Sequence, residues 1–281
     1  NYDEIDLRPF LNRDYSFPVI FSKYCPYSCT YCVAQRTGLM ERELEIIKEE
    51  LIYLKEKGFK RFALMGNNLT LNKTKFIELC KFMKSLNVEW SGDGRVDHMA
   101  QEMYDALKGS KGTVLFGIES ANKKILEKIK KRITIEQIIK NSDELRKRNI
   151  PFRYTFMFGF PDDSVQTANE MIKLKKRVGA LNYHCIFLSP LPNTPLFEEM
   201  IKLGLIDEEN LDFIDFVNPY NEAFCGTLNL TKEEVKKQGM KIMKRAVFNE
   251  STIKHIIKHR RIKEYPPLIK KGFNLIFMEK R

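Results

Sequence analysis

Strand-like and helix-like segments alternate along most of the chain, and this alternation is the strongest constraint on its fold. Strands are predicted at residues 17–24, 61–66, 88–94, 112–120, 151–161 and 181–192, and a predicted helix follows each of them. Strict alternation favours a parallel sheet with right-handed crossovers. We therefore expect an α/β fold, either an open doubly wound sheet or a partial (β/α)6 barrel of the TIM type. In both folds the functional residues lie at the carboxyl ends of the strands.

The pattern changes towards both ends of the chain. Residues 1–16 are polar and are interpreted as an N-terminal linker, residues 17–204 hold the repeated units, and residues 205–281 form a mostly helical C-terminal appendage. The N-terminus does not resemble a signal or transit peptide, and no apolar run is long enough to predict a transmembrane segment. The six cysteines are too sparse for a disulfide scaffold, so we expect a reducing, cytoplasmic setting.

Positive charge is concentrated near the C-terminus. Nine basic and two acidic residues between Ser251 and Arg281 carry +7 of the formal net charge of +11. Such a tail suits contact with RNA, membrane phosphates or an acidic partner. A solvated basic helix is the simpler interpretation of the same residues.

Three cysteines, Cys25, Cys29 and Cys32, lie in one short loop directly after the first predicted strand. Zinc ligands, disulfide partners, a redox pair and iron–sulfur ligands are the alternatives. A structural zinc site needs four ligands, and the nearest histidine is His98. A redox pair of Cys29 and Cys32 leaves Cys25 unexplained. Three thiolates leave one metal position open, which suits a [4Fe–4S] cluster with one iron free for a substrate ligand.

This C-x3-C-x-aromatic-C loop, placed after the first strand of a βα array, resembles the radical S-adenosylmethionine (SAM) superfamily. The resemblance covers residues from about Pro18 to Phe197. It implies a partial (β/α)6 barrel, a [4Fe–4S] cluster on the three cysteines, and SAM bound to the open iron. A reductant such as flavodoxin or ferredoxin would deliver one electron, which cleaves SAM to methionine and a 5′-deoxyadenosyl radical. That radical would take hydrogen from a substrate, for which a small molecule is expected.

The resemblance also implies contacts to SAM in the first half of the barrel. Tyr31 places an aromatic ring beside the metal. Gly66, Asn67 and Asn68 stand where the family usually has an acidic segment for the SAM amino group, and an Asn carbonyl can accept a hydrogen bond from an ammonium. An ordinary turn rich in Gly and Asn is the alternative. Arg95 is expected to pair with the SAM carboxylate or a substrate anion, with Asp97 as a helix cap.

Further contacts are implied in the second half. Glu119 and Ser120 end the fourth predicted strand, where family members contact the SAM ribose or amine, although Ser120 also suits a helix cap. Arg153 points either to the SAM carboxylate or to solvent. The backbone of Leu188 is the expected contact to adenine. Gly159 and Pro161 are expected to shape the turn that follows the fifth strand.

The motifs YDEIDL, CPYSCTYC, FGIES, FGFP and LPNTPL together resemble radical SAM proteins that carry an N-terminal cobalamin-binding domain. Members of that group methylate unactivated carbons or phosphorus, or close rings. The chain contains no D-x-H-x-x-G cobalamin motif, so cobalamin is implied by the resemblance alone. The tRNA methylthiotransferases share the strand motifs, and the basic tail keeps RNA as an alternative substrate. The alternative in which the chain is not an enzyme is a metal-stabilised module that binds nucleic acid.

Overall fold

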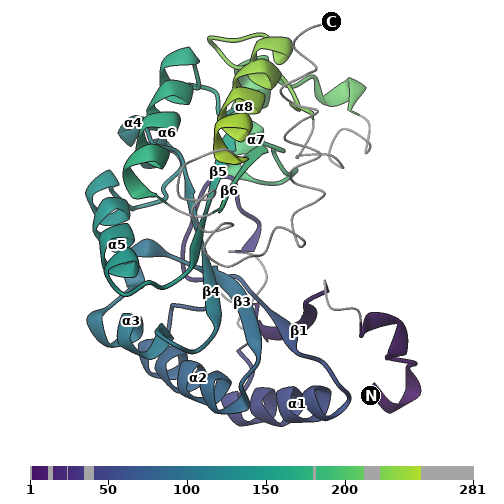
Figure 1. Ribbon diagram of the computed structural model, residues 1–281. Helices are drawn as coiled ribbons and strands as arrows, with labels where there is room; N and C mark the ends of the chain where they lie inside the picture. Colours follow the sequence, from purple (N-terminus) through teal and green to yellow (C-terminus); the bar gives the residue numbers. More distant parts are fainter. Residues whose placement is uncertain are drawn as a thin grey trace, which may run out of the picture. The chain divides into compact units, whose positions relative to one another are not determined.

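The computed structural model describes residues 2–11, 15–23, 25–34, 41–179, 182–211 and 222–247. Six strands of the described residues form one sheet whose order follows the sequence from β1 to β6 (Figure 1). The pairs β1–β2, β2–β3, β3–β4 and β5–β6 are all parallel. The predicted α/β fold on six parallel strands is therefore confirmed.

The strands lie within or close to their predicted segments. They are β1 (Phe17–Ser22), β2 (Arg61–Gly66), β3 (Glu89–Gly94), β4 (Gly112–Glu119), β5 (Phe152–Phe158) and β6 (Asn182–Phe187). The helices are α1 (Leu44–Glu56), α2 (Lys73–Leu86), α3 (Gln101–Leu107), α4 (Lys123–Lys128), α5 (Ile135–Lys147), α6 (Val165–Val178), α7 (Pro195–Lys202) and α8 (Lys232–Val247). The short helix α4 is an addition to the predicted pattern.

The chain divides into two compact units. The first unit comprises residues 1–27, 34–117 and 143–152, and therefore holds β1 to β3 and most of β4. The second comprises residues 28–33, 118–142 and 153–281, and holds the last two residues of β4, all of β5 except Phe152, and β6. The boundary passes through the cysteine loop, so that Cys25 belongs to the first unit while Cys29 and Cys32 belong to the second.

In the first unit, α1 to α3 lie along one face of the strands (Figure 1). Ile47 and Leu51 of α1 and Phe76 of α2 are fully buried, as is Phe62 of β2. Met65, which has the opposite parity on β2, is 51% exposed. The period of two therefore directs one set of side chains into the helix-covered core and leaves the other set on the open face of the sheet.

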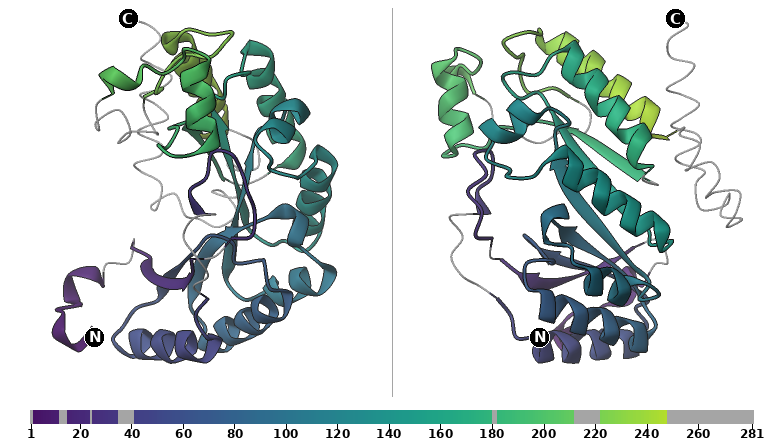
Figure 2. Two further views of the ribbon diagram at one scale, coloured as in Figure 1. Left: turned by 180° about the vertical axis from the view of Figure 1, so that it is seen from behind. Right: turned by 90° about the vertical axis from the view of Figure 1, so that its left-hand side faces the viewer.

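In the second unit, α8 packs against β6 and alongside α6 (Figure 2). A Cβ atom at Gly239 of α8 would lie 2.2 Å from the ring of Phe187, so only glycine permits this close approach. The helix of the predicted appendage is thus part of the second unit. The predicted domain boundaries after residues 16 and 204 stay predictions.

Two further predictions concern contact with RNA and with the membrane. The RNA contact depends on the basic tail from Ser251 to Arg281, which lies outside the described residues. Among the helices that the structure describes, none combines the length and apolar character needed to cross a membrane.

Candidate active site

The cysteine loop carries free thiols. All six cysteines are unpaired, and this excludes the disulfide interpretation of the loop. Cys29 is buried, whereas Cys25 and Cys32 are partly exposed. Burial raises the pKa of the three scattered thiols, Cys80, Cys185 and Cys225, above the usual range, so they are poor sources of thiolate. The clustered thiols are therefore the ones available for metal ligation or chemistry.

A polar cluster stands at the carboxyl ends of β2 and β3 in the first unit. We call it the Arg95 cluster, and its members are Tyr27, Asn68, Thr70, Arg95, Asp97 and His98. The side chain of Arg95 is 6% exposed. Its Nε and one terminal nitrogen donate to the two carboxylate oxygens of Asp97 at 3.0 and 2.9 Å. The guanidinium carbon also lies 3.7 Å from the ring centroid of Tyr27, a cation–π contact that includes a residue of the cysteine loop.

This geometry corrects the role predicted for Asp97. The residue lies within a short 3-10 helix (Val96–His98), and the N-cap of α3 is Ala100. Asp97 therefore does not cap the following helix and instead forms a bidentate pair with Arg95. Charge-assisted hydrogen bonds of this kind are roughly twice as strong as neutral ones, so Asp97 pairs with Arg95 instead of capping the helix.

His98 closes the Arg95 cluster. Its Nε2 is hydrogen bonded to the hydroxyl of Tyr27, and its Nδ1 lies 3.3 Å from Nδ2 of Asn68. The Asn68 oxygen accepts a hydrogen bond from the hydroxyl of Thr70 at 2.9 Å. Burial lowers the pKa of His98, so its ring is neutral at physiological pH. Because both ring nitrogens face protein partners, His98 does not offer the fourth ligand that a structural zinc site requires.

A second polar cluster lies in the second unit at the carboxyl end of β4. We call it the Lys131 triad, and it consists of Tyr31, Glu119 and Lys131. Oε1 of Glu119 accepts hydrogen bonds from Nζ of Lys131 at 2.7 Å and from the hydroxyl of Tyr31 at 3.0 Å. Nζ of Lys131 also donates to the Tyr31 oxygen at 3.2 Å. The side chains of Lys131 and Glu119 are only 8% and 7% exposed, so this is a buried ion pair.

The Tyr31 ring is partly exposed, but its hydroxyl sits against these two buried side chains. Burial, with the nearby Glu119 carboxylate, raises the pKa of Tyr31 well above its usual range. The hydroxyl therefore stays protonated and donates to Glu119. Oε2 of Glu119 accepts no hydrogen bond from the described residues, so one carboxylate oxygen is available to a ligand.

The backbone at the end of β4 adopts an uncommon conformation. Glu119 has a φ of 57°, and the N–H of Ser120 donates to the carbonyl of Ile118 at 2.7 Å. A positive φ at a non-glycine residue is costly and is found where the surrounding structure holds it, often at functional sites. The tight turn directs the Glu119 side chain to Tyr31 and Lys131.

The segment from Ile129 to Lys131 supports the cysteine loop within the same unit. The N–H of Thr30 donates to the Ile129 carbonyl at 3.0 Å, and Sγ of Cys29 lies 3.8 Å from the carbonyl oxygen of Lys130. On the other side, the N–H of Leu196 in α7 donates to the Thr30 carbonyl at 3.0 Å. The loop from Cys29 to Cys32 is therefore held by backbone as well as by side chains.

The turn after β5 is built around a buried carboxylate that the sequence did not single out. Gly159 has a φ of 117°, as its predicted role in shaping the turn requires. Asp163 accepts hydrogen bonds from the N–H groups of Gly159 and Phe160 at 2.9 and 3.0 Å and from the Thr167 hydroxyl at 2.7 Å. Burial nevertheless raises the pKa of Asp163 to about 6, because no cation lies among these partners.

Several other predicted site residues have structural partners. A Cβ atom at Gly66 would lie 3.0 Å from Oγ of Ser22, so close packing against β1 accounts for this glycine. Asn67 is exposed. Ser120 is fully buried, and its hydroxyl accepts the N–H of Asn122 at 3.1 Å, in the turn that leads into α4.

Leu188 and Arg153 lie at opposite ends of the strands of the second unit. Leu188 follows β6, and its N–H donates to the carbonyl of Phe158 at 2.8 Å, beside the turn after β5. Arg153 is the second residue of β5 and pairs in register with Asn182, the first residue of β6. Phe158 lies five positions farther along the strand, or about 17 Å at the usual rise. Within its unit, Arg153 is thus not brought together with the carboxyl-end residues.

Four cluster members were not predicted as site residues from the sequence, namely Tyr27, Thr70, His98 and Lys131. Lys131 stands between Lys130 and Arg132, and both of these neighbours are exposed. A run of three basic residues carries no signal that tells which one is buried. Tyr27 offered a better clue, because it lies between two of the three clustered cysteines.

The donor set fits an iron–sulfur cluster in its chemistry. Three free thiols at C-x3-C-x2-C spacing are the ligands that a [4Fe–4S] cluster with one open iron uses. In the described part of the chain, no three His, Cys, Asp or Glu side chains converge as ligands for one metal ion. Since Cys25 belongs to a different unit from Cys29 and Cys32, the ligand set is defined by the spacing in the sequence.

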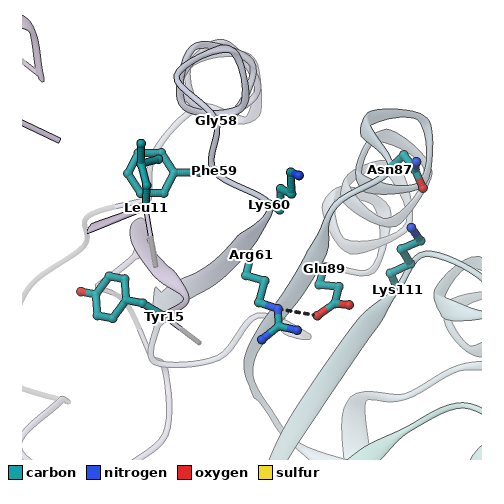
Figure 3. A pocket seen from close by; sticks show the side chains of 9 residues that line it. All are labelled: Leu11, Tyr15, Gly58, Phe59, Lys60, Arg61, Asn87, Glu89 and Lys111. Carbon is teal, nitrogen blue, oxygen red and sulfur yellow. Dashed lines mark ion pairs between the residues drawn. The ribbon is translucent and has the colours of Figure 1, made fainter. Parts of the chain in front are cut away.

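A pocket of about 440 Å³ lies in the first unit at the opposite edge of the sheet (Figure 3). It is lined by Leu11, Tyr15, Gly58, Phe59, Lys60, Arg61, Asn87, Glu89 and Lys111. Arg61 and Glu89 are the first residues of β2 and β3, and they form an ion pair at 2.9 Å. The pocket thus adjoins the amino ends of the strands, whereas the polar clusters stand at carboxyl ends, where α/β folds carry their chemistry.

Solved structures with a similar fold include a radical SAM methyltransferase. The structure of TsrM from Kitasatospora setae, a radical SAM methyltransferase with cobalamin and a [4Fe–4S] cluster bound, matches with a TM-score of 0.62 at 17% identity, covering 84% of this chain and 47% of that one. At this identity the likeness shows the fold alone. It confirms the predicted fold class, a partial (β/α)6 barrel of parallel strands.

Sequence relatives agree with this fold. An uncharacterised methyltransferase of Pyrococcus horikoshii is 30% identical over 245 residues, which cover 84% of this chain and 52% of that protein. A bacteriochlorophyllide d C-12(1)-methyltransferase of Chlorobaculum tepidum is 28% identical over 197 residues, which cover 65% of this chain and 42% of that protein. The chain thus spans about half the length of the curated relatives it matches. The family model of the Radical SAM superfamily matches residues 19–174, and the chain belongs to that superfamily.

Proposed function

We propose that this chain is a radical SAM enzyme that modifies a C–H bond of a small molecule, with methyl transfer as the outcome. Cys25, Cys29 and Cys32 would hold the [4Fe–4S] cluster. The observation that carries the proposal is the cysteine loop itself, in which three free thiols share the loop with Tyr31, and Tyr31 is tied to the strand-end residue Glu119. A structural metal site has no need of a buried ion pair beside its ligands.

The chain's own residues supply binding and orientation. When bound, the cluster and SAM supply one electron and a 5′-deoxyadenosyl radical. Oε2 of Glu119, which accepts no hydrogen bond from the described residues, is available to an amine or a ribose hydroxyl of SAM. The backbone of Leu188, beside the turn after β5, is proposed for adenine.

The role that we now propose for Arg95 is not to bind the SAM carboxylate or a substrate anion. Both oxygens of Asp97 already pair with its guanidinium, which lies on the ring of Tyr27. We assign Arg95 to ordering the part of the loop that ends at Tyr27. Asn68 would offer its amide to SAM only by exchanging its contacts to Thr70 and His98.

The finer points of the proposal are supported by relatives. TsrM is a methyltransferase whose structure contains cobalamin, and two relatives are methyltransferases by name. We therefore propose cobalamin-dependent methylation. We also propose a reducing cytoplasm, from the sparse cysteines, and flavodoxin or ferredoxin as the electron donor, from the resemblance of the cysteine loop. A small-molecule substrate is in keeping with the bacteriochlorophyllide named for one relative.

Anaerobic reconstitution tests the proposal. The protein is supplied with iron and sulfide, and then with dithionite and SAM. We expect a brown protein that releases 5′-deoxyadenosine, loss of the product in Cys29→Ala, and retention of it in Cys225→Ser, which changes a free thiol outside the loop. A colourless zinc-containing protein, or a reconstituted cluster that never cleaves SAM, would contradict the proposal.

A further inference from the structure

We propose that Lys131 is a positioning residue for the metal-binding loop, because it ties Tyr31 to the end of β4. The inference rests on the proposed function, since it concerns the cluster that the loop would hold. The role assigned to Lys131 is indirect. It acts through the tyrosine that lies between Cys29 and Cys32.

The backbone around Lys131 is shaped to bury this one side chain. Lys130 and Arg132 have positive φ values of 53° and 56°, and both are exposed, whereas Lys131 is 6% exposed. Two positive φ values at non-glycine residues are costly. Burying an ammonium group is costly as well, unless it is paired and hydrogen bonded. The fold tolerates both costs within three consecutive residues, and the buried side chain of the middle one contacts Tyr31 and Glu119.

The contacts form a continuous support. Residues 129, 130 and 131 contact residues 30, 29 and 31 of the loop through an N–H to carbonyl bond, a thiol to carbonyl contact and an ammonium to hydroxyl bond. The first two contacts use backbone atoms that any residue at 129 and 130 would supply. The third is made by the side chain of Lys131, so it can be removed without changing the others.

The triad also sets the charge beside the ligands. With Lys131 present, the Glu119 carboxylate is compensated by an ammonium at 2.7 Å. Without it, a buried negative charge would stand against Tyr31, the residue that lies between Cys29 and Cys32 in the sequence. Hydrogen bonds and charges around iron–sulfur clusters tune both their stability and their reduction potential. An uncompensated carboxylate opposes the addition of an electron, so it lowers the potential.

The experiment compares Lys131→Met with Lys124→Met, which changes an exposed lysine of α4. Both are reconstituted anaerobically, and two properties are measured: the rate of cluster loss to a chelator, from absorbance, and the midpoint potential, from electron paramagnetic resonance. We expect cluster loss in Lys131→Met to be faster by about 10- to 100-fold, as for other residues that orient metal ligands. Its midpoint potential should be more negative. Lys124→Met should match the wild type in both.

A double variant, Lys131→Met with Glu119→Gln, keeps the test decisive if the single variant fails to fold. It leaves no unpaired charge, so its potential should return towards the wild-type value, while cluster loss remains faster than in Lys124→Met because the ammonium tether is gone. Equal rates of cluster loss in the folded Lys131 variant and in Lys124→Met would overturn the inference. A wild-type protein that assembles no cluster would instead overturn the proposed function.

Discussion

Tyr27 and Tyr31 stand four residues apart in the cysteine loop, yet different kinds of polar cluster hold them. In the first unit, the ring of Tyr27 contacts the guanidinium of Arg95, whose charge is paired with Asp97 only two residues away in the sequence. In the second unit, the ion pair of Glu119 and Lys131 joins the end of β4 to the loop after α4, and Tyr31 donates directly to the carboxylate.

The comparison separates two ways of fixing a flexible loop. The Arg95 cluster offers a flat, charged surface for ring stacking, and the tyrosine hydroxyl bonds to a neutral histidine. The Lys131 triad offers a charge-assisted hydrogen bond inside a buried ion pair. Hydrogen bonds to charged groups contribute about 1.5 to 3 kcal/mol, against about 1 kcal/mol between neutral groups. The second unit should therefore be the more sensitive of the two to loss of a single partner.

Glu119→Ala should have the largest effect. It leaves the Lys131 ammonium buried with no carboxylate, and breaking a buried ion pair in this way costs about 3 to 5 kcal/mol of unfolding free energy. Urea denaturation followed by circular dichroism measures the loss. The matched control is Glu127→Ala, on α4, where the ion pair with Lys123 is exposed and 3.8 Å long. That control should cost less than about 1 kcal/mol. Equal losses in the two variants would refute the idea of a buried, structurally coupled triad.

Asp163 shows what a buried carboxylate does without a cation. Burial raises its pKa from 3.8 to about 6, so the folded state holds a proton that the unfolded state has already released between about pH 4 and 6. The contribution of this carboxyl to unfolding free energy therefore falls as pH rises through that window, and stays lost at pH 7. A shift of two pKa units corresponds to about 3 kcal/mol.

Asp163→Asn tests this sign. The asparagine is neutral throughout, so the stability of the variant relative to the wild type should rise by about 3 kcal/mol between pH 4 and 7. Urea denaturation at several pH values gives the difference. Asp162→Asn, which changes the neighbouring carboxylate paired with Lys128 at the surface, should show a nearly flat difference. A flat profile for Asp163→Asn as well would mean that the three donors, and not burial, control this group.

Much of the architecture could be predicted from the sequence. Alternating segments gave six parallel strands, because period-two and helical patterns are local and strong. The same logic placed Glu119 at the carboxyl end of β4. Arg153 shows the limit of the resemblance, which implied a contact to SAM for a residue near the start of the predicted segment 151–161. The structure begins β5 at Phe152, which puts Arg153 at the amino end of the strand.

Pairing within the clusters was beyond the sequence. Lys130, Lys131 and Arg132 are equivalent as a pattern, and only the backbone turns at 130 and 132 decide which one is buried. Asp97 suits a helix cap by propensity, but its bidentate contact with Arg95 is a tertiary preference that overrides it. Charged residues choose partners by three-dimensional geometry, which periodicity does not encode.

Arg95→Lys tests the first unit's side of the comparison, with a smaller expected effect. A lysine keeps the charge but loses the bidentate contact with Asp97 and the flat stacking on Tyr27, for a loss of about 2 kcal/mol. Fluorescence of Trp90, the chain's one tryptophan, reports unfolding of the unit that contains Arg95, because this residue is buried there at 3% exposure.

The matched control is Arg61→Lys in the same unit, at the edge of the pocket in Figure 3. Arg61 pairs with Glu89 at 2.9 Å, but the two side chains are 31% and 45% exposed, so solvent screens the pair and the substitution should cost less than about 1 kcal/mol. If both substitutions cost the same, stacking and the bidentate contact add nothing to Arg95, and Tyr27 is held by its hydroxyl alone. If Arg95→Lys costs as much as Glu119→Ala, the two anchors are equally strong, and the contrast between local and long-range charge pairing fails.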